Sequence, residues 1–99
     1  MIRRIEVSPR AQSEIAGIWE YTALEYGEDA ADAYVTELDA VMLRALEYPL
    51  MGADCPEVRK GYRRIRAGGQ MIYYIPHQRG IDVMRVMHPR QHAREHLKE

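Results

Sequence analysis

The chain has 99 residues, of which 46% are hydrophobic and 29% charged, and its formal net charge is −1 at pH 7. This composition is that of an ordinary globular protein and excludes a disordered, low-complexity or membrane-spanning chain. The length predicts a single domain over residues 1–99, and the N-terminus MIRRIEV lacks a signal-peptide core, so we expect a cytoplasmic protein with no membrane contact.

The two parts of the chain carry opposite charge. Residues 1–57 hold 4 basic and 12 acidic residues, a net charge of −8, whereas residues 58–99 hold 10 basic and 3 acidic residues, a net charge of +7. Such a division predicts the field that a protein presents to its partners rather than its fold. We therefore expect the C-terminal part to attract an acidic partner.

The first predicted element is a short strand, IRRIEV at residues 2–7. Ser8 and Pro9 follow it and are typical of a helix start, because serine caps free amide groups and proline is preset for the first helical position.

Two helices are predicted next. Apolar residues recur at spacings of three and four over residues 11–26, and Gly27 ends this stripe. A second stripe covers residues 31–45 and ends before Tyr48 and Pro49. Because the turn at Gly27 is so short, the two helices must be antiparallel.

The second half of the chain predicts a loop, PLMGADCPEVRK, with Cys55 as a loop residue, and then a three-stranded antiparallel meander. Two turn signals, Gly68-Gly69 and HQRG, separate its strands. The strands are GYRRIRA (61–67), QMIYYIP (70–76) and IDVMRVM (81–87). The fold class is therefore α+β with the order β-α-α-β-β-β, a helical hairpin on one face of an antiparallel-rich four-stranded sheet.

Alternation along the last strand directs Met84 and Val86 to one face, and Ile81, Val83, Arg85 and Met87 to the other. A sheet that is apolar on both faces needs two covers, and one helical hairpin supplies only one. We expect part of the second face, including Arg85, to stay open for a partner. The alternative is that the residues after His88 cover this face completely.

The stretch VMRVMHPRQHAREH at residues 83–96 is rich in arginine and histidine. His92 and His96 would share a helix face with His88 just below, a spacing that suits zinc. No cysteine or carboxylate stands at ligand spacing apart from Glu95, which would point elsewhere on such a helix. We therefore expect neither a metal nor a cofactor. Arg90 and Arg94 would share a neighbouring face and could bind carboxylates or phosphates, or form a solvated tail.

A second basic group lies on the first strand of the meander. Alternation directs Arg64 and Arg66 to one face and Arg63 to the other. These arginines could bind a partner or only solvate an edge strand. Tyr74 could stack on bases or pack in the core.

Several stretches in this order resemble the ParE toxins of bacterial type II toxin–antitoxin modules, in the wider ParE/RelE superfamily. They are Ser8-Pro9, IWEYTALEYG (18–27), YPLMG (48–52), GYRRI (61–65), IYY (72–74) and VMRVMHPRQ (83–91). The resemblance implies a toxin that inhibits DNA gyrase by binding, with no covalent chemistry of its own. It also implies a hetero-oligomer with a ParD-like antitoxin and no sequence-specific DNA binding by the toxin itself.

RelE-type relatives are ribosome-dependent endoribonucleases of messenger RNA, and they are the main alternative. RelE-type nucleases resemble one another in carrying an arginine early in the third strand, and this chain has Met71 at that position. Arg90 and His96, in contrast, match positions of their active sites. This departure favours the ParE side. A third alternative is a non-toxic module that binds an antitoxin. The candidate residues for contact with target or antitoxin are Arg63, Arg64, Arg66, Tyr74, Arg85, His88, Arg90, His92, Arg94 and His96.

Overall fold

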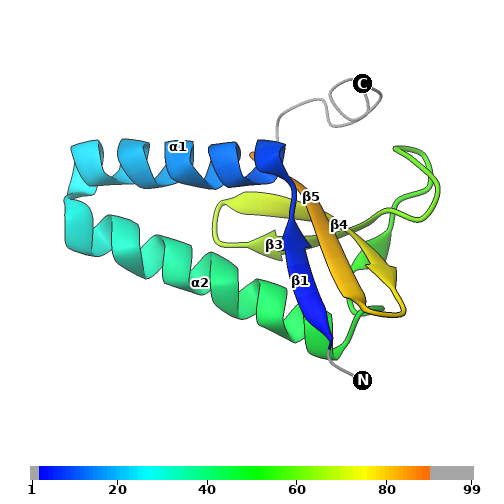
Figure 1. Cartoon of the computed structure of the whole chain (residues 1–99). Helices are drawn as coiled ribbons and strands as arrows, with labels where there is room; N and C mark the ends of the chain where they lie inside the picture. The colour runs from blue at the N-terminus through cyan, green and yellow to red at the C-terminus, as the bar shows by residue number, and fades with distance from the viewer. Residues whose placement is uncertain (1–2, 90–99) are drawn as a thin grey trace.

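A computed structural model describes residues 3–89, in which two helices cover one face of a mixed sheet (Figure 1). The elements are β1 (Arg4–Val7), α1 (Pro9–Tyr26), α2 (Glu28–Glu47), β2 (Ala53–Asp54), β3 (Arg63–Ala67), β4 (Gln70–His77) and β5 (Gly80–Met87). The predicted α+β class and the positions of both helices are confirmed, and the element order differs from the predicted one only by the additional short strand β2.

The helical hairpin begins and turns where the sequence predicts. The Ser8 hydroxyl accepts a hydrogen bond from the Ala11 amide at 3.0 Å, and Pro9 occupies the first turn of α1. Gly27 joins the helices with φ at +95°, a backbone conformation that favours glycine. Glu28 and Asp29 lie in the first turn of α2, where the helix dipole favours carboxylates.

The sheet has five strands in the order β1-β5-β4-β3-β2, and β1 pairs with β5 in parallel. The other neighbours are antiparallel. The fifth strand, β2, lies in the stretch that the sequence predicts as a loop, where Ala53 and Asp54 pair with Arg64 and Arg63. Two residues are too few to produce a periodic pattern, so the sequence predicted four strands.

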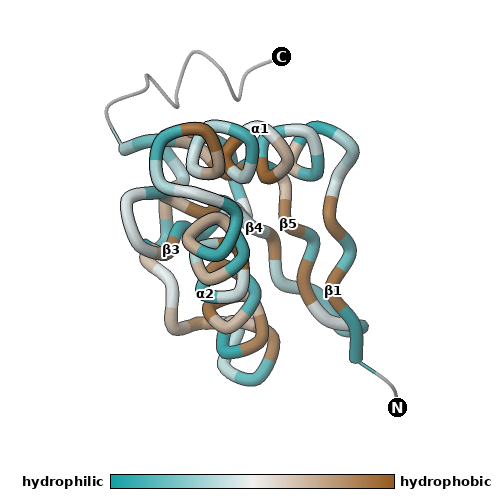
Figure 2. The backbone as a smooth tube through the Cα atoms, turned by 90° about the vertical axis from the view of Figure 1, so that its left-hand side faces the viewer, coloured by the Kyte–Doolittle hydropathy of each residue, from teal (hydrophilic) through white to brown (hydrophobic). Residues whose placement is uncertain are grey.

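The main core lies between the helices and the sheet. It contains Leu38, Val41 and Met42 of α2, with Ile72 and Tyr74 of β4 and Ile81, Val83 and Val86 of β5. Figure 2, which views the molecule from the hairpin's tip, shows hydrophobic and hydrophilic residues interspersed along both helices. Within the described residues, no helix is long and apolar enough to cross a membrane.

The predicted alternation along β5 is wrong because the strand contains a bulge. Tyr74 pairs with Val83 but Tyr73 pairs with Arg85, so Met84 is an extra residue. The bulge shifts the alternation by one position. Val83 and Val86 therefore both face the helices, whereas Met84 and Met87 pack on the opposite face.

That opposite face is covered by the segment between β2 and β3. Cys55, Val58 and Tyr62 of this segment pack against a cluster that includes Tyr73 and Met87. The expectation that part of this face stays open overlooked the segment, because its apolar residues follow no strand or helix period. The alternative, that the chain after His88 covers this face, concerns residues 90–99, which lie outside the described residues. Burial raises the pKa of the Cys55 thiol.

Candidate functional site

The edge of β5 beyond the end of β1 is closed by α1. β1 ends at Val7, and Ser8 then donates from its amide to the Val83 carbonyl oxygen at 2.9 Å and from its hydroxyl to the Met84 carbonyl oxygen at 2.8 Å. Six residues later the Glu14 carboxylate accepts from the Val86 amide at 2.8 Å. Ser8, which caps α1, and Glu14 of α1 thus satisfy strand groups that would otherwise lack a partner.

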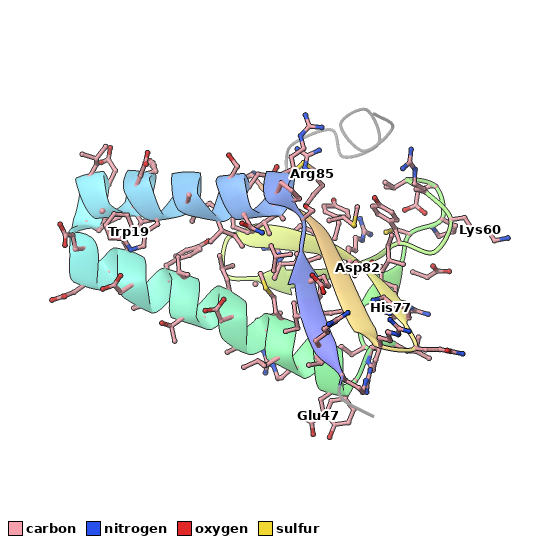
Figure 3. The ribbon with its side chains drawn as sticks, viewed as in Figure 1. Trp19, Glu47, Lys60, His77, Asp82 and Arg85 are labelled. Carbon is pink, nitrogen blue, oxygen red and sulfur yellow. The ribbon has the colours of Figure 1, made fainter. Side chains whose placement is uncertain are left out.

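Arg85 is held at this edge by the same carboxylate. Its Nε and Nη2 atoms donate to Glu14 Oε2 at 3.0 and 2.7 Å, and the residue is only 8% exposed (Figure 3). The expectation of an open Arg85 is therefore wrong. Glu14 lies 71 positions earlier in the chain, and nothing in the local sequence of either residue indicates the pair.

Arg63 and Tyr74 hold the loop that follows α2. The Tyr74 hydroxyl donates to the Pro49 carbonyl oxygen at 2.8 Å and accepts from the Gly52 amide at 3.0 Å, while Arg63 Nη1 donates to the Gly52 carbonyl oxygen at 2.7 Å. Burial raises the pKa of Tyr74. A Cβ atom at Gly52 would lie 2.5 Å from that hydroxyl, so only glycine fits there.

Arg64 and Arg66 are exposed on the face opposite the helices, as the alternation predicts. They pair across the strands with Tyr73 and Met71, which belong to the apolar cluster on that face. Burial raises the pKa of Tyr73, and the neighbouring Arg64 guanidinium partly opposes this shift. These two arginines offer cations beside apolar surface, which suits an acidic, amphipathic partner.

A groove of about 550 Å³ runs along α1 toward the ends of β4 and β5, and the sequence analysis did not find it. Gly17 opens it, because a Cβ atom at this helix position would meet no atom within 4 Å. The sequence does contain one signal for this groove, the glycine inside a predicted helix, since alanine would stabilise the helix more than glycine. The lining residues are Glu14, Gly17, Ile18, Tyr21, Thr22, Tyr26, Tyr34, Gln70, Val86 and His88.

The predicted site residues are therefore not one cluster. Arg64 and Arg66 lie together on one face, and His88 lines the groove. Arg90, His92, Arg94 and His96 lie outside the described residues. Among residues 3–89, no group of three or more His, Cys, Asp or Glu side chains is arranged to hold a metal ion.

Comparison with known proteins identifies relatives over nearly the whole chain. Residues 5–93 match the family described as ParE toxin of type II toxin-antitoxin system. The chain is 37% identical over 98 residues to Toxin ParE1 from two Mycobacterium tuberculosis strains, covering 98% of this chain and 100% of each relative. It is 34% identical over 91 residues to Toxin ParE1 of Caulobacter vibrioides, covering 92% of this chain and 94% of that relative.

A solved structure shares the fold. A chain from a chromosomal ParDE TA system of P. aeruginosa superimposes with a TM-score of 0.75, covering 88% of this chain and 96% of that one. The sequences are 13% identical, so this likeness concerns the arrangement of helices and strands.

Proposed function

The chain belongs to the ParE toxin family of type II toxin–antitoxin systems, and from this premise we propose that residues 1–99 form one toxin domain that inhibits DNA gyrase by binding. The observation that carries the proposal is the family match over residues 5–93. Met71 supports inhibition by binding. It packs in an apolar cluster, at the position where RelE-type nucleases carry an arginine.

A gyrase assay with the purified chain tests this proposal. We expect the protein to reduce supercoiling of relaxed plasmid and to trap double-strand breaks, and an excess of cognate antitoxin to reverse both effects. If gyrase is unaffected but messenger RNA is cut in a translation reaction, the protein is an endoribonuclease. If neither occurs and expression leaves growth unchanged, it is a non-toxic binding module.

We also propose that a ParD-like antitoxin occupies the groove along α1. The groove offers apolar and aromatic side chains, among them Ile18, Tyr21 and Tyr34, and it ends at His88. Arg90 and Arg94 follow His88 in the sequence, and Arg64 and Arg66 add cations on the face of the sheet opposite the helices. Apolar anchors in the groove and cations elsewhere on the same molecule suit an acidic antitoxin segment that folds on binding.

Two pairs of variants test the antitoxin surface. Gly17→Leu fills the groove, whereas Ala16→Leu adds the same side chain at an exposed neighbouring position of α1 outside the groove. Arg66→Glu reverses an exposed charge on the face of the sheet opposite the helices, whereas Arg79→Glu does so in an exposed turn. We expect calorimetry to show weaker antitoxin binding for the first variant of each pair. Equal affinity within both pairs would contradict this placement.

A further inference from the structure

The tip of the helical hairpin projects beyond the sheet (Figure 1). At this tip, α1 carries a second groove. This second groove of about 370 Å³ is lined by Trp19, Glu20, Ala23, Leu24 and Glu28, and shares no residue with the groove along α1 that ends at His88. We name these five residues the tip surface. The two grooves lie on different sides of α1, so occupation of one leaves the side chains of the other available.

The tip surface has a rigid apolar base. Trp19 Nε1 donates to Asp32 Oδ1 of α2 at 2.8 Å, which fixes the indole between the two helices (Figure 3). Beside it Leu24 is 87% exposed, the highest value among the large hydrophobic residues of the described chain. A fixed tryptophan next to an exposed leucine resembles the centre of a protein interface, where ordering side chains on binding is unfavourable.

The surroundings of the tip surface are acidic. Residues 11–43 contain eight acidic residues and no lysine or arginine. Glu14 is occupied by Arg85, but Glu20 and Glu28 flank the groove itself. The last turn of α1 contains Glu25 and no basic residue, although the helix dipole favours a cation at that end. Local helix stability therefore explains Glu28, which lies in the first turn of α2, but it does not explain Glu25 at the end of α1.

The negative charge around the tip surface indicates a partner with a basic surface. An acidic rim repels an acidic antitoxin segment and also repels the same tip on a second copy, but it attracts a basic surface. An enzyme that binds DNA presents lysine and arginine toward phosphate. We propose that the tip surface docks on a basic, DNA-contacting surface of gyrase, an inference that rests on the proposed function. Figure 3 places Trp19 of the tip surface and Lys60 of the basic C-terminal part of the chain at opposite ends of the molecule.

The test measures binding of immobilised toxin to purified gyrase at low and moderate salt. Leu24→Ser removes the apolar contact, and Leu43→Ser is its control, since Leu43 is an exposed leucine near the other end of α2. Glu25→Lys reverses a charge in the last turn of α1, and Glu47→Lys does the same at the last residue of α2.

We expect Leu24→Ser and Glu25→Lys each to weaken gyrase binding by about tenfold, the loss typical of an interface hot spot, with both controls like wild type. Glu25→Lys should also reduce the salt dependence of gyrase binding, while antitoxin affinity stays unchanged and the thermal unfolding midpoint does not fall. Absence of gyrase binding by the wild type contradicts the proposed function. Wild-type binding that either tip variant retains overturns the inference, as does a finding that Leu24→Ser abolishes only self-association.

Discussion

Replacing Glu14 by alanine should strongly destabilise the fold, because this helix residue satisfies groups at the end of β5. Its carboxylate accepts three hydrogen bonds, from Arg85 Nε, Arg85 Nη2 and the Val86 amide. Removing one partner of a buried ion pair costs about 3–5 kcal/mol, and a buried amide without an acceptor adds about 1 kcal/mol. Because the Glu14 side chain is 21% exposed, we take the lower end of this sum and expect a loss of about 4 kcal/mol.

Urea unfolding followed by circular dichroism measures this loss. A chain of this size has a free energy of unfolding of about 5–15 kcal/mol, so the midpoint should fall by a large fraction. Glu20→Ala on the exposed side of the same helix is the control and should change stability by less than about 0.5 kcal/mol. Glu14→Gln keeps one acceptor but no charge and should lie between the two. If Glu14→Ala loses less than about 1 kcal/mol, Arg85 does not depend on this carboxylate and our reasoning about the β5 edge is refuted.

Three further perturbations follow from the structure. Gly17→Ala should raise the free energy of unfolding by about 0.5–1 kcal/mol, since its Cβ meets no atom within 4 Å, and yet weaken antitoxin binding; a lower unfolding midpoint would contradict this. Tyr74→Phe removes one donor and one acceptor from the loop after α2 and should cost about 1–3 kcal/mol in urea unfolding, whereas Tyr48→Phe, an exposed position, should cost almost nothing. The pKa values of Cys55, Tyr73 and Tyr74 are raised in the folded state above ordinary values of 9.0, 10.0 and 10.0, so the unfolded chain ionises first as pH rises. The contribution of these groups to the free energy of unfolding should then be constant below about pH 9 and fall above it. A urea midpoint that does not change up to about pH 10.5 would show that their burial is incomplete.

Periodic parts of the fold could be predicted from the sequence. Both helices and the three strands of the meander follow from apolar spacing and from turn residues such as Gly27. β2 could not be predicted, because two residues carry no period. The bulge at Met84 was missed for a different reason. Alternation assumes that each residue of a strand lies opposite one residue of its neighbour, whereas a bulge depends on how the partner strand pairs.

The candidate site was less predictable because its main features depend on contacts between distant parts of the chain. Alternation correctly placed Arg64 and Arg66 on one face. Arg85 looked available because its partner, Glu14, comes from a helix that the sequence places elsewhere. Tyr74 and Arg63 hold a loop through backbone groups, which are present at every residue and therefore leave no sequence signal.

The parallel pairing of β1 with β5 determines when the sheet can be completed during synthesis of the chain. Arg4 pairs with Gly80, so the first strand waits for a partner that is translated 76 positions later. At ordinary rates of translation this interval lasts about 4–15 s. Throughout that time the sheet cannot close and Glu14 has no Arg85 to bind, so a growing chain lacks the finished scaffold that supports both grooves. An antitoxin already present in the cell would therefore meet the toxin at the moment when its folding is completed.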